Sequence, residues 1–211
     1  MRKLILRMQM SLDGYVSGPD GGVRWIFDSM DDRLVSWTVE TISQAGLHIM
    51  GSRTFNDMVS YWPTSDEPIA APMNTIPKMV FSRTARPGSA STKALEDATG
   101  VRAARGGQAV SGAIPGAESW TDVPVLTGDL ATEIAALKQQ PGRDILAHGG
   151  VGFAHSLLRT GLIDEYHLIV HPVALGAGRS LFTALDKPMR LGLLHAITFG
   201  SGAVAHIYRP G

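Results

Sequence analysis

Short apolar segments that alternate with helix-like segments are the feature that most constrains the fold of this 211-residue chain. The stretch at 144–172 shows the pattern clearly. An apolar run at 145–147 stops at Gly149 and Gly150, a helix-like segment follows at once, and a second apolar run spans 166–170. Strands joined through a helix pair in parallel, because the crossover returns the chain to the same end of the sheet. We therefore expect an α/β fold.

The same alternation extends over most of the chain. Further strands are predicted at 2–10, 47–50, 78–82 and 123–126, and helices at 31–46, 52–62 and 128–140. The strands are short and apolar or alternate at period two, whereas apolar residues in the helices recur every three or four positions. Near the C-terminus, two alternating runs are joined by Gly200, Ser201 and Gly202, which indicates a hairpin. The predicted fold is a mostly parallel sheet flanked by helices, with a C-terminal antiparallel hairpin.

Length and composition limit the possible functions. A chain of this length is expected to form a single domain over 1–211, with the Gly-, Ala- and Ser-rich residues 85–121 as a loop or insertion within it. There are 19 basic and 19 acidic residues, so net charge gives no reason to expect a nucleic acid or a membrane as partner. The apolar runs are too short for a signal peptide or a spanning helix, which favours a cytoplasmic protein.

The sequence has no cysteine and no histidine motif of a metal site. The chain has no cysteine, which excludes disulfides, thiolate nucleophiles and cysteine-based metal sites. Its seven histidines are scattered and show no HExxH spacing, so no metal site is predicted.

Three predicted strands end in small or cationic residues, in the segments 51–54, 82–84 and 149–153. Ligands bind at the carboxyl ends of parallel strands, where glycine allows close approach and a following helix offers free N–H groups to phosphate. Arg53 and Arg83 would add forked donors. Each segment alone is also typical of a tight turn, and neither a G-x-G-x-x-G motif nor a P-loop lysine is present. A phosphate-bearing cofactor and plain turns therefore remain the two interpretations.

Two carboxylates are candidate catalytic acids. Asp13 lies in the sequence SLDG, where a turn former is the alternative, and Asp31 precedes the first predicted helix, where an N-cap is the alternative. Trp25 lies near a glycine-rich loop and would either pack in the core or line a planar substrate.

Four segments carry a resemblance to a known family. MSLDGYVSG, GLHIMGSRTF, KMVFSRT and DILAHGGVGFAHSLLRTGLIDEYHLIVHPVALGAGRSLF, in this order, resemble the bacterial dihydrofolate-reductase-like proteins of the RibD C-terminal-domain family. The resemblance implies a dihydrofolate-reductase-like sheet, NADPH as cofactor and a homodimer. Riboflavin-pathway members reduce the ribose of a 5-amino-6-ribosylaminouracil 5′-phosphate to a ribityl chain.

The resemblance also implies roles for residues of this chain. The 2′-phosphate and pyrophosphate would contact Gly51, Ser52, Arg53 and Thr54; the adenosine would contact Phe81, Ser82 and Arg83; and the pyrophosphate and nicotinamide would contact Gly149, Gly150, Val151, Gly152 and Phe153. The peptide bond between Gly149 and Gly150 would be cis. Substrate contacts would come from Gln9, Asp13, Trp25 and Asp31.

The sequence departs from the family pattern in two places. The first-helix position that carries a carboxylate in dihydrofolate reductases falls near Leu34 or Val35 here, so no catalytic acid is assigned. The missing cysteines exclude the zinc deaminase domain of the bifunctional riboflavin enzymes. We expect an NADPH-dependent reductase of a small heterocycle, pteridine- or ribosylaminopyrimidine-like. The alternative is a non-catalytic nucleotide-binding dimeric scaffold that kept the fold.

Overall fold

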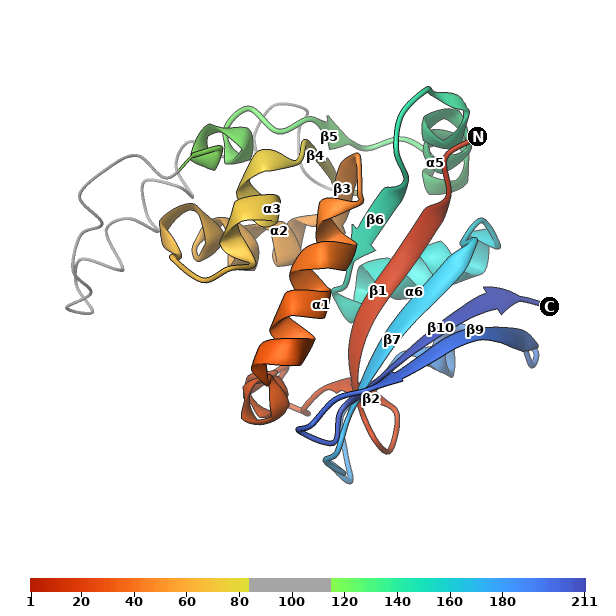
Figure 1. The fold of residues 1–211 in the computed structure, drawn as a ribbon. Coiled ribbons are helices and arrows are strands. Elements are labelled where there is room, and N and C mark those ends of the chain that lie inside the picture. Colours follow the sequence, from red (N-terminus) through yellow and green to blue (C-terminus); the bar gives the residue numbers. More distant parts are fainter. Residues whose placement is uncertain (84–114) are drawn as a thin grey trace.

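The computed structural model describes residues 1–83 and 115–211. Within them, the main strands are β1 (Leu4–Ser11), β3 (Leu47–Gly51), β4 (Lys78–Phe81), β5 (Val125–Leu126), β6 (Ile145–His148), β7 (Glu165–His171), β9 (Leu191–Thr198) and β10 (Val204–Pro210). They form one sheet in the order β5-β4-β3-β6-β1-β7-β10-β9 (Figure 1). Pairing is parallel from β5 through β7 and antiparallel at β7–β10 and β10–β9. The predicted parallel sheet with a C-terminal hairpin is confirmed.

Helices cover both faces of this sheet. They are α1 (Asp32–Ser43), α2 (Ser52–Val59), α3 (Ala70–Thr75), α5 (Leu130–Gln139) and α6 (Val151–Thr160), with short 3-10 helices η1 (Arg24–Ser29), η2 (Trp62–Thr64), η3 (Ala117–Trp120) and η4 (Phe182–Ala184). Figure 1 shows α1 in front of the sheet and α6 behind it. Side chains of α1, α2 and α3 pack in one buried cluster, and those of α5 and α6 pack in another on the opposite face.

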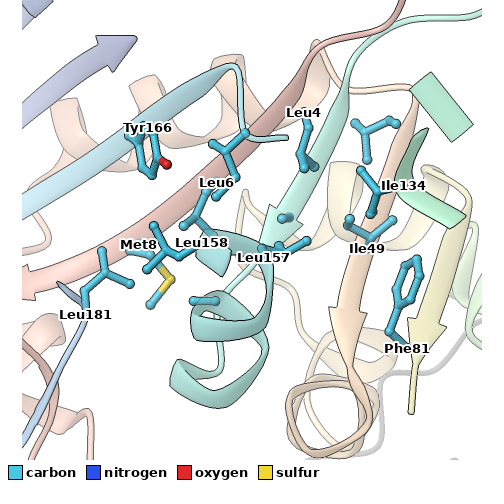
Figure 2. Close-up of a cluster of buried hydrophobic side chains, with 14 of the residues drawn as sticks. Leu4, Leu6, Met8, Ile49, Phe81, Ile134, Leu157, Leu158, Tyr166 and Leu181 are labelled. Atoms are coloured by element: carbon cyan, nitrogen blue, oxygen red, sulfur yellow. The ribbon is translucent and has the colours of Figure 1, made fainter. Parts of the chain in front are cut away.

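The alternation in β1 explains its central position. Leu4, Leu6 and Met8 are buried in the cluster with Leu157 and Leu158 of α6 (Figure 2). Because successive side chains of a strand point to opposite faces, the residues between them face α1. A parallel strand in the middle of a sheet is covered on both sides, so polar residues on it must find partners.

Two parts of the described structure differ from the expectation. A short second sheet pairs β2 (Tyr15–Ser17) with β8 (Arg179–Ser180), which the glycine-rich sequence around both segments concealed. At the C-terminal end of the predicted loop 85–121, the short η3 buries Trp120 completely, and Nε1 of Trp120 donates to Oδ1 of Asn74 at 2.7 Å. The rest of that predicted loop, up to residue 114, lies outside the described residues.

Membrane insertion through a helix has no support in the described ranges. None of the helices found there is long and apolar enough to cross a bilayer.

Candidate active site

A cleft of about 1100 Å³ opens where β1, β3, β4 and β6 reach their carboxyl ends. This is the edge at which ligands bind in open α/β sheets. The cleft brings together every predicted cofactor position: Gly51, Ser52, Arg53, Thr54, Phe81, Ser82, Arg83, Gly149, Gly150, Val151, Gly152 and Phe153. The three strand ends that the sequence selected therefore form one continuous surface.

The turn between β6 and α6 admits only glycine at Gly150 and is closely packed at Gly149. Gly150 has a φ of 94°, and a Cβ atom on it would clash with Oγ1 of Thr54. A Cβ atom on Gly149 would lie 2.8 Å from Sδ of Met8. Oγ1 of Thr54 also donates to the carbonyl oxygen of Gly149 at 2.8 Å, which ties α2 to this turn. Glycine is thus required at Gly150, and Gly149 allows the close packing of β1 against the turn.

The predicted cis bond between Gly149 and Gly150 is wrong. No peptide bond in the described residues is cis. The chain reverses there through the positive φ of Gly150, a conformation that glycine adopts without steric cost.

Two helices direct their N-termini at the cleft without a side-chain cap. α2 begins after Gly51 and α6 after Gly150, and neither of these N-cap residues supplies a hydrogen-bonding side chain. The first N–H groups of a helix have no partner within it, and the helix dipole makes that end favourable for anions. The pair of N-termini therefore suits a pyrophosphate or another doubly anionic group.

Aromatic and cationic side chains form a further part of the cleft lining. The rings of Phe81 and Phe153 stack with centroids 5.5 Å apart and an interplanar angle of 24°. The exposed side chains of Arg53, Arg83 and Arg179 also line the cleft. Guanidinium groups at the rim favour phosphate oxygens, since they can donate two parallel hydrogen bonds.

The floor of the cleft contains Arg7, Gln9 and His148. Nη2 of Arg7 donates to Oγ1 of Thr38 at 2.9 Å, whereas its Nε atom is buried without a partner in the described structure. Desolvation lowers the pKa of Arg7 to about 10, so the guanidinium stays charged at neutral pH. Burial, followed by the charge of Arg7, lowers the pKa of His148 to about 3, so this imidazole is neutral. The floor presents one positive charge and several donors.

Asp13 does not line the cleft; it organises a neighbouring turn. Its Oδ1 accepts from Oγ of Ser11 at 2.6 Å and from N of Leu175 at 3.1 Å, and its Oδ2 accepts from N of Gly176 at 2.7 Å. The hydrogen bond from Ser11 and those from the backbone lower the pKa of Asp13 to about 2. An ionised carboxylate with both oxygens engaged is a poor proton donor.

Asp31 and Trp25 also lie outside the cleft lining, whereas Gln9 is part of it. Asp31 caps α1, because its Oδ1 accepts from N of Leu34 and its Oδ2 from N of Ser201, both at 2.7 Å. Trp25 packs edge-on against the ring of His171, with centroids 5.5 Å apart. The contacts of Asp31 are therefore those of a helix cap, and the contact of Trp25 is ring packing.

Sequence patterns missed Arg7, His148 and Arg179, which line the cleft. Arg7 did leave a signal. A cation in the middle of an apolar strand that is covered on both faces needs a specific partner or a ligand, since isolated buried charge is costly. The sequence contains no comparable signal for Arg179, because the position of Arg179 depends on the pairing of β2 with β8.

An open, mostly parallel sheet with a glycine turn and two uncapped helix N-termini at one cleft defines an α/β protein whose site suits a phosphate-bearing ligand. The model of the RibD C-terminal domain family matches residues 2–205, and the chain belongs to this family. The predicted resemblance is confirmed.

Individual relatives agree with this assignment. The chain is 25% identical over 212 residues to the uncharacterized protein YyaP of Bacillus subtilis, covering 98% of this chain and 94% of YyaP. Among solved structures, a protein described as belonging to riboflavin biosynthesis, from Shewanella sp. PV-4, aligns over 99% of both chains with a TM-score of 0.67 and 20% identity. A diaminohydroxyphosphoribosylaminopyrimidine deaminase/5-amino-6-(5-phosphoribosylamino)uracil reductase of Thermotoga maritima aligns with a TM-score of 0.64 and 15% identity, over all of this chain and 57% of that one. At these identities, the two structures show the shared dihydrofolate-reductase-like fold.

Proposed function

We propose that this protein is an NADPH-dependent reductase of a small heterocycle, of the pteridine or ribosylaminopyrimidine type. The observation that carries the proposal is the Gly149–Gly150 turn, packed against Thr54 between two uncapped helix N-termini at the carboxyl ends of the strands. Membership of the RibD C-terminal domain family and the reductase named in the Thermotoga maritima structure support it.

The residues of the cleft fit such a cofactor. Residues 51–54 and 149–153 would hold the pyrophosphate and the nicotinamide side, because they begin two helices whose N-cap residues supply no hydrogen-bonding side chain. Arg53 would contact the 2′-phosphate, and residues 81–83 would lie against the adenosine. NADPH supplies a hydride when bound, and the protein supplies orientation and a site shielded from water.

The floor of the cleft would hold the substrate. The charged guanidinium of Arg7, which lines the cleft, favours an electron-rich or anionic substituent. Neutral His148 cannot deliver a proton at neutral pH, since its pKa lies near 3. Binding and orientation are therefore the roles that these side chains can perform.

The direct test is NADPH oxidation, followed by absorbance, with 5-amino-6-(5-phosphoribosylamino)uracil and a panel of pteridines. The proposal expects oxidation that depends on one of these substrates and saturates with it. Tight NADPH binding without oxidation by any of them would instead support the alternative, a non-catalytic nucleotide-binding scaffold. The absence of a carboxylate at Leu34, which is fully buried, is the observation that favours this alternative.

We also propose a homodimer. Strand β9 is the last strand of the sheet and pairs with β10 alone among the described strands, and it exposes Leu193 and Leu194. Apolar side chains on an open edge strand favour association with another chain. Sedimentation equilibrium should give twice the monomer mass, and a monomer at micromolar concentration would contradict the proposal.

A further inference from the structure

A buried histidine connects the cleft to the 3-10 helix η1. His171, at the end of β7, is fully buried, and its two ring nitrogens have different partners. Nδ1 lies 2.7 Å from Oγ of Ser29, and Nε2 lies 2.7 Å from Oε1 of Gln9. The ring of Trp25 packs edge-on against the imidazole and restricts its rotation. These contacts form a chain from Ser29 through His171 to Gln9.

The hydrogen bonds that link Ser29, His171 and Gln9 have a defined donor-to-acceptor direction. Burial, followed by the charge of Arg7, lowers the pKa of His171 to about 4, so the imidazole is neutral at neutral pH and has one N–H. An amide oxygen can only accept, so Nε2–H donates to Oε1 of Gln9, and Nδ1 accepts from the hydroxyl of Ser29.

The reversed arrangement is less favourable. If the amide of Gln9 were turned over, Nδ1–H would have to donate to Ser29, and the buried hydroxyl hydrogen of Ser29 would lose its acceptor. His171 is the one side-chain partner of Ser29 in the described residues. Leaving a buried donor unpaired costs about 1–3 kcal/mol, which favours the first arrangement.

This arrangement also determines the orientation of the Nε2 group of Gln9. With Oε1 held by His171, the Nε2 group of Gln9 points its hydrogens away from the imidazole. No described residue accepts a hydrogen bond from it, and Gln9 lines the cleft beside Arg7. The cleft therefore contains an amide donor whose orientation is fixed before any ligand arrives.

We propose that His171 and Ser29 are positioning residues that hold Gln9 as a hydrogen-bond donor to the substrate. Gln9 would then select a heterocycle that presents an acceptor, a carbonyl oxygen or an unprotonated ring nitrogen, next to the group held by Arg7. An oxo-pyrimidine edge has this chemistry. The inference rests on the proposed reductase function and adds to it the donor–acceptor pattern of the substrate.

Two substitutions at Gln9 separate a donor from an acceptor. Gln9→Met removes both functions, whereas Gln9→Glu keeps an acceptor and loses the donor. With 5-amino-6-(5-phosphoribosylamino)uracil and NADPH, both variants should raise KM for the pyrimidine roughly tenfold or more. The Kd for NADPH should change less than twofold in both. A Gln9→Glu variant with the wild-type KM, or a Gln9→Met variant that loses only NADPH affinity, would overturn the proposal.

His171 is tested by a conservative pair. His171→Leu removes the contact to Gln9 and should raise KM for the pyrimidine, whereas His171→Gln can donate to Gln9 and accept from Ser29 and should recover most of the wild-type KM. A structural role alone predicts that both variants lose stability without this difference in KM. Equal KM values in the two variants would therefore contradict the positioning role.

A measurement on the wild-type protein tests the hydrogen bonds between Ser29, His171 and Gln9 without any substrate. Nitrogen-15 NMR of the imidazole rings should show the Nε2–H tautomer for His171 at neutral pH, and Ser29→Ala should perturb its Nδ1 resonance. An Nδ1–H tautomer would overturn the donor assignment of Gln9. Failure of the pyrimidine to oxidise NADPH in the wild type would instead contradict the proposed function, so the two failures are distinct.

Discussion

Gly150 shows how one residue sets the geometry of the cleft. Its φ of 94° and the clash of a Cβ atom with Thr54 both exclude a side chain, so Gly150→Ala should lower the free energy of unfolding by about 1–3 kcal/mol. Gly152 is the matched control, because it lies in α6 and a Cβ atom there meets nothing within 4 Å. Gly152→Ala should raise stability by roughly 0.5 kcal/mol. Urea unfolding of both variants checks this, and equal losses would contradict the account.

Arg53 is the residue expected to distinguish the two nicotinamide cofactors. It lines the cleft at the start of α2, so Arg53→Ala should weaken NADPH by about tenfold while changing NADH little. Arg159 is the control, since it lies in the last turn of α6, away from the N-terminus that faces the cleft. Isothermal titration measures both affinities. An equal loss of affinity for NADPH and NADH would contradict a contact between Arg53 and the 2′-phosphate.

At the scale of the element, α1 depends on Asp31. This side chain caps the helix through N of Leu34 and also holds N of Ser201 in the β9–β10 turn. Asp31→Ala should lower the thermal unfolding midpoint by about 2–4 °C. NADPH affinity should stay at the wild-type value, because Asp31 does not line the cleft. A stable variant that has lost cofactor binding or turnover would instead return Asp31 to the list of functional residues.

Elements were predictable where local pattern determines them. The period-two alternation of β1, the glycine that ends β3 and the glycines after β6 predicted the strands and their ends, and these ends meet in the cleft. Contacts between distant segments were not predictable. Gln9 and His171 are 162 positions apart, and their hydrogen bond follows from the pairing of β1 with β7. Trp120 was missed because the Gly- and Ala-rich sequence before it resembles a loop.

For the whole molecule, buried neutral histidines predict sensitivity to acid. Burial, followed by repulsion from His148, lowers the pKa of His48 well below its usual value, and His148 and His171 are lowered to about 3 and about 4. Between about pH 6.5 and pH 4 the unfolded chain binds protons that the folded chain does not. Stability should therefore fall as pH falls through this range, by up to about 1.4 kcal/mol per pH unit for each histidine.

Urea unfolding at several pH values from 7.5 to 4 measures this slope. His48→Leu should flatten it, because burial holds the pKa of His48 well below its usual value and leucine takes up no proton. His195→Leu is the control, since His195 is exposed on β9. A slope that His48→Leu leaves unchanged would contradict the assignment of acid sensitivity to His48.

The central claim is that the cleft is built for NADPH, and a thermal shift with NADPH, NADH and no ligand tests it most directly. A cofactor that binds only the folded chain, at about 100 times its Kd, adds about 2.7 kcal/mol. For a chain of this size, that should raise the unfolding midpoint by about 5–10 °C. The account predicts a shift of this order with NADPH and a smaller one with NADH. No shift with either cofactor would contradict it.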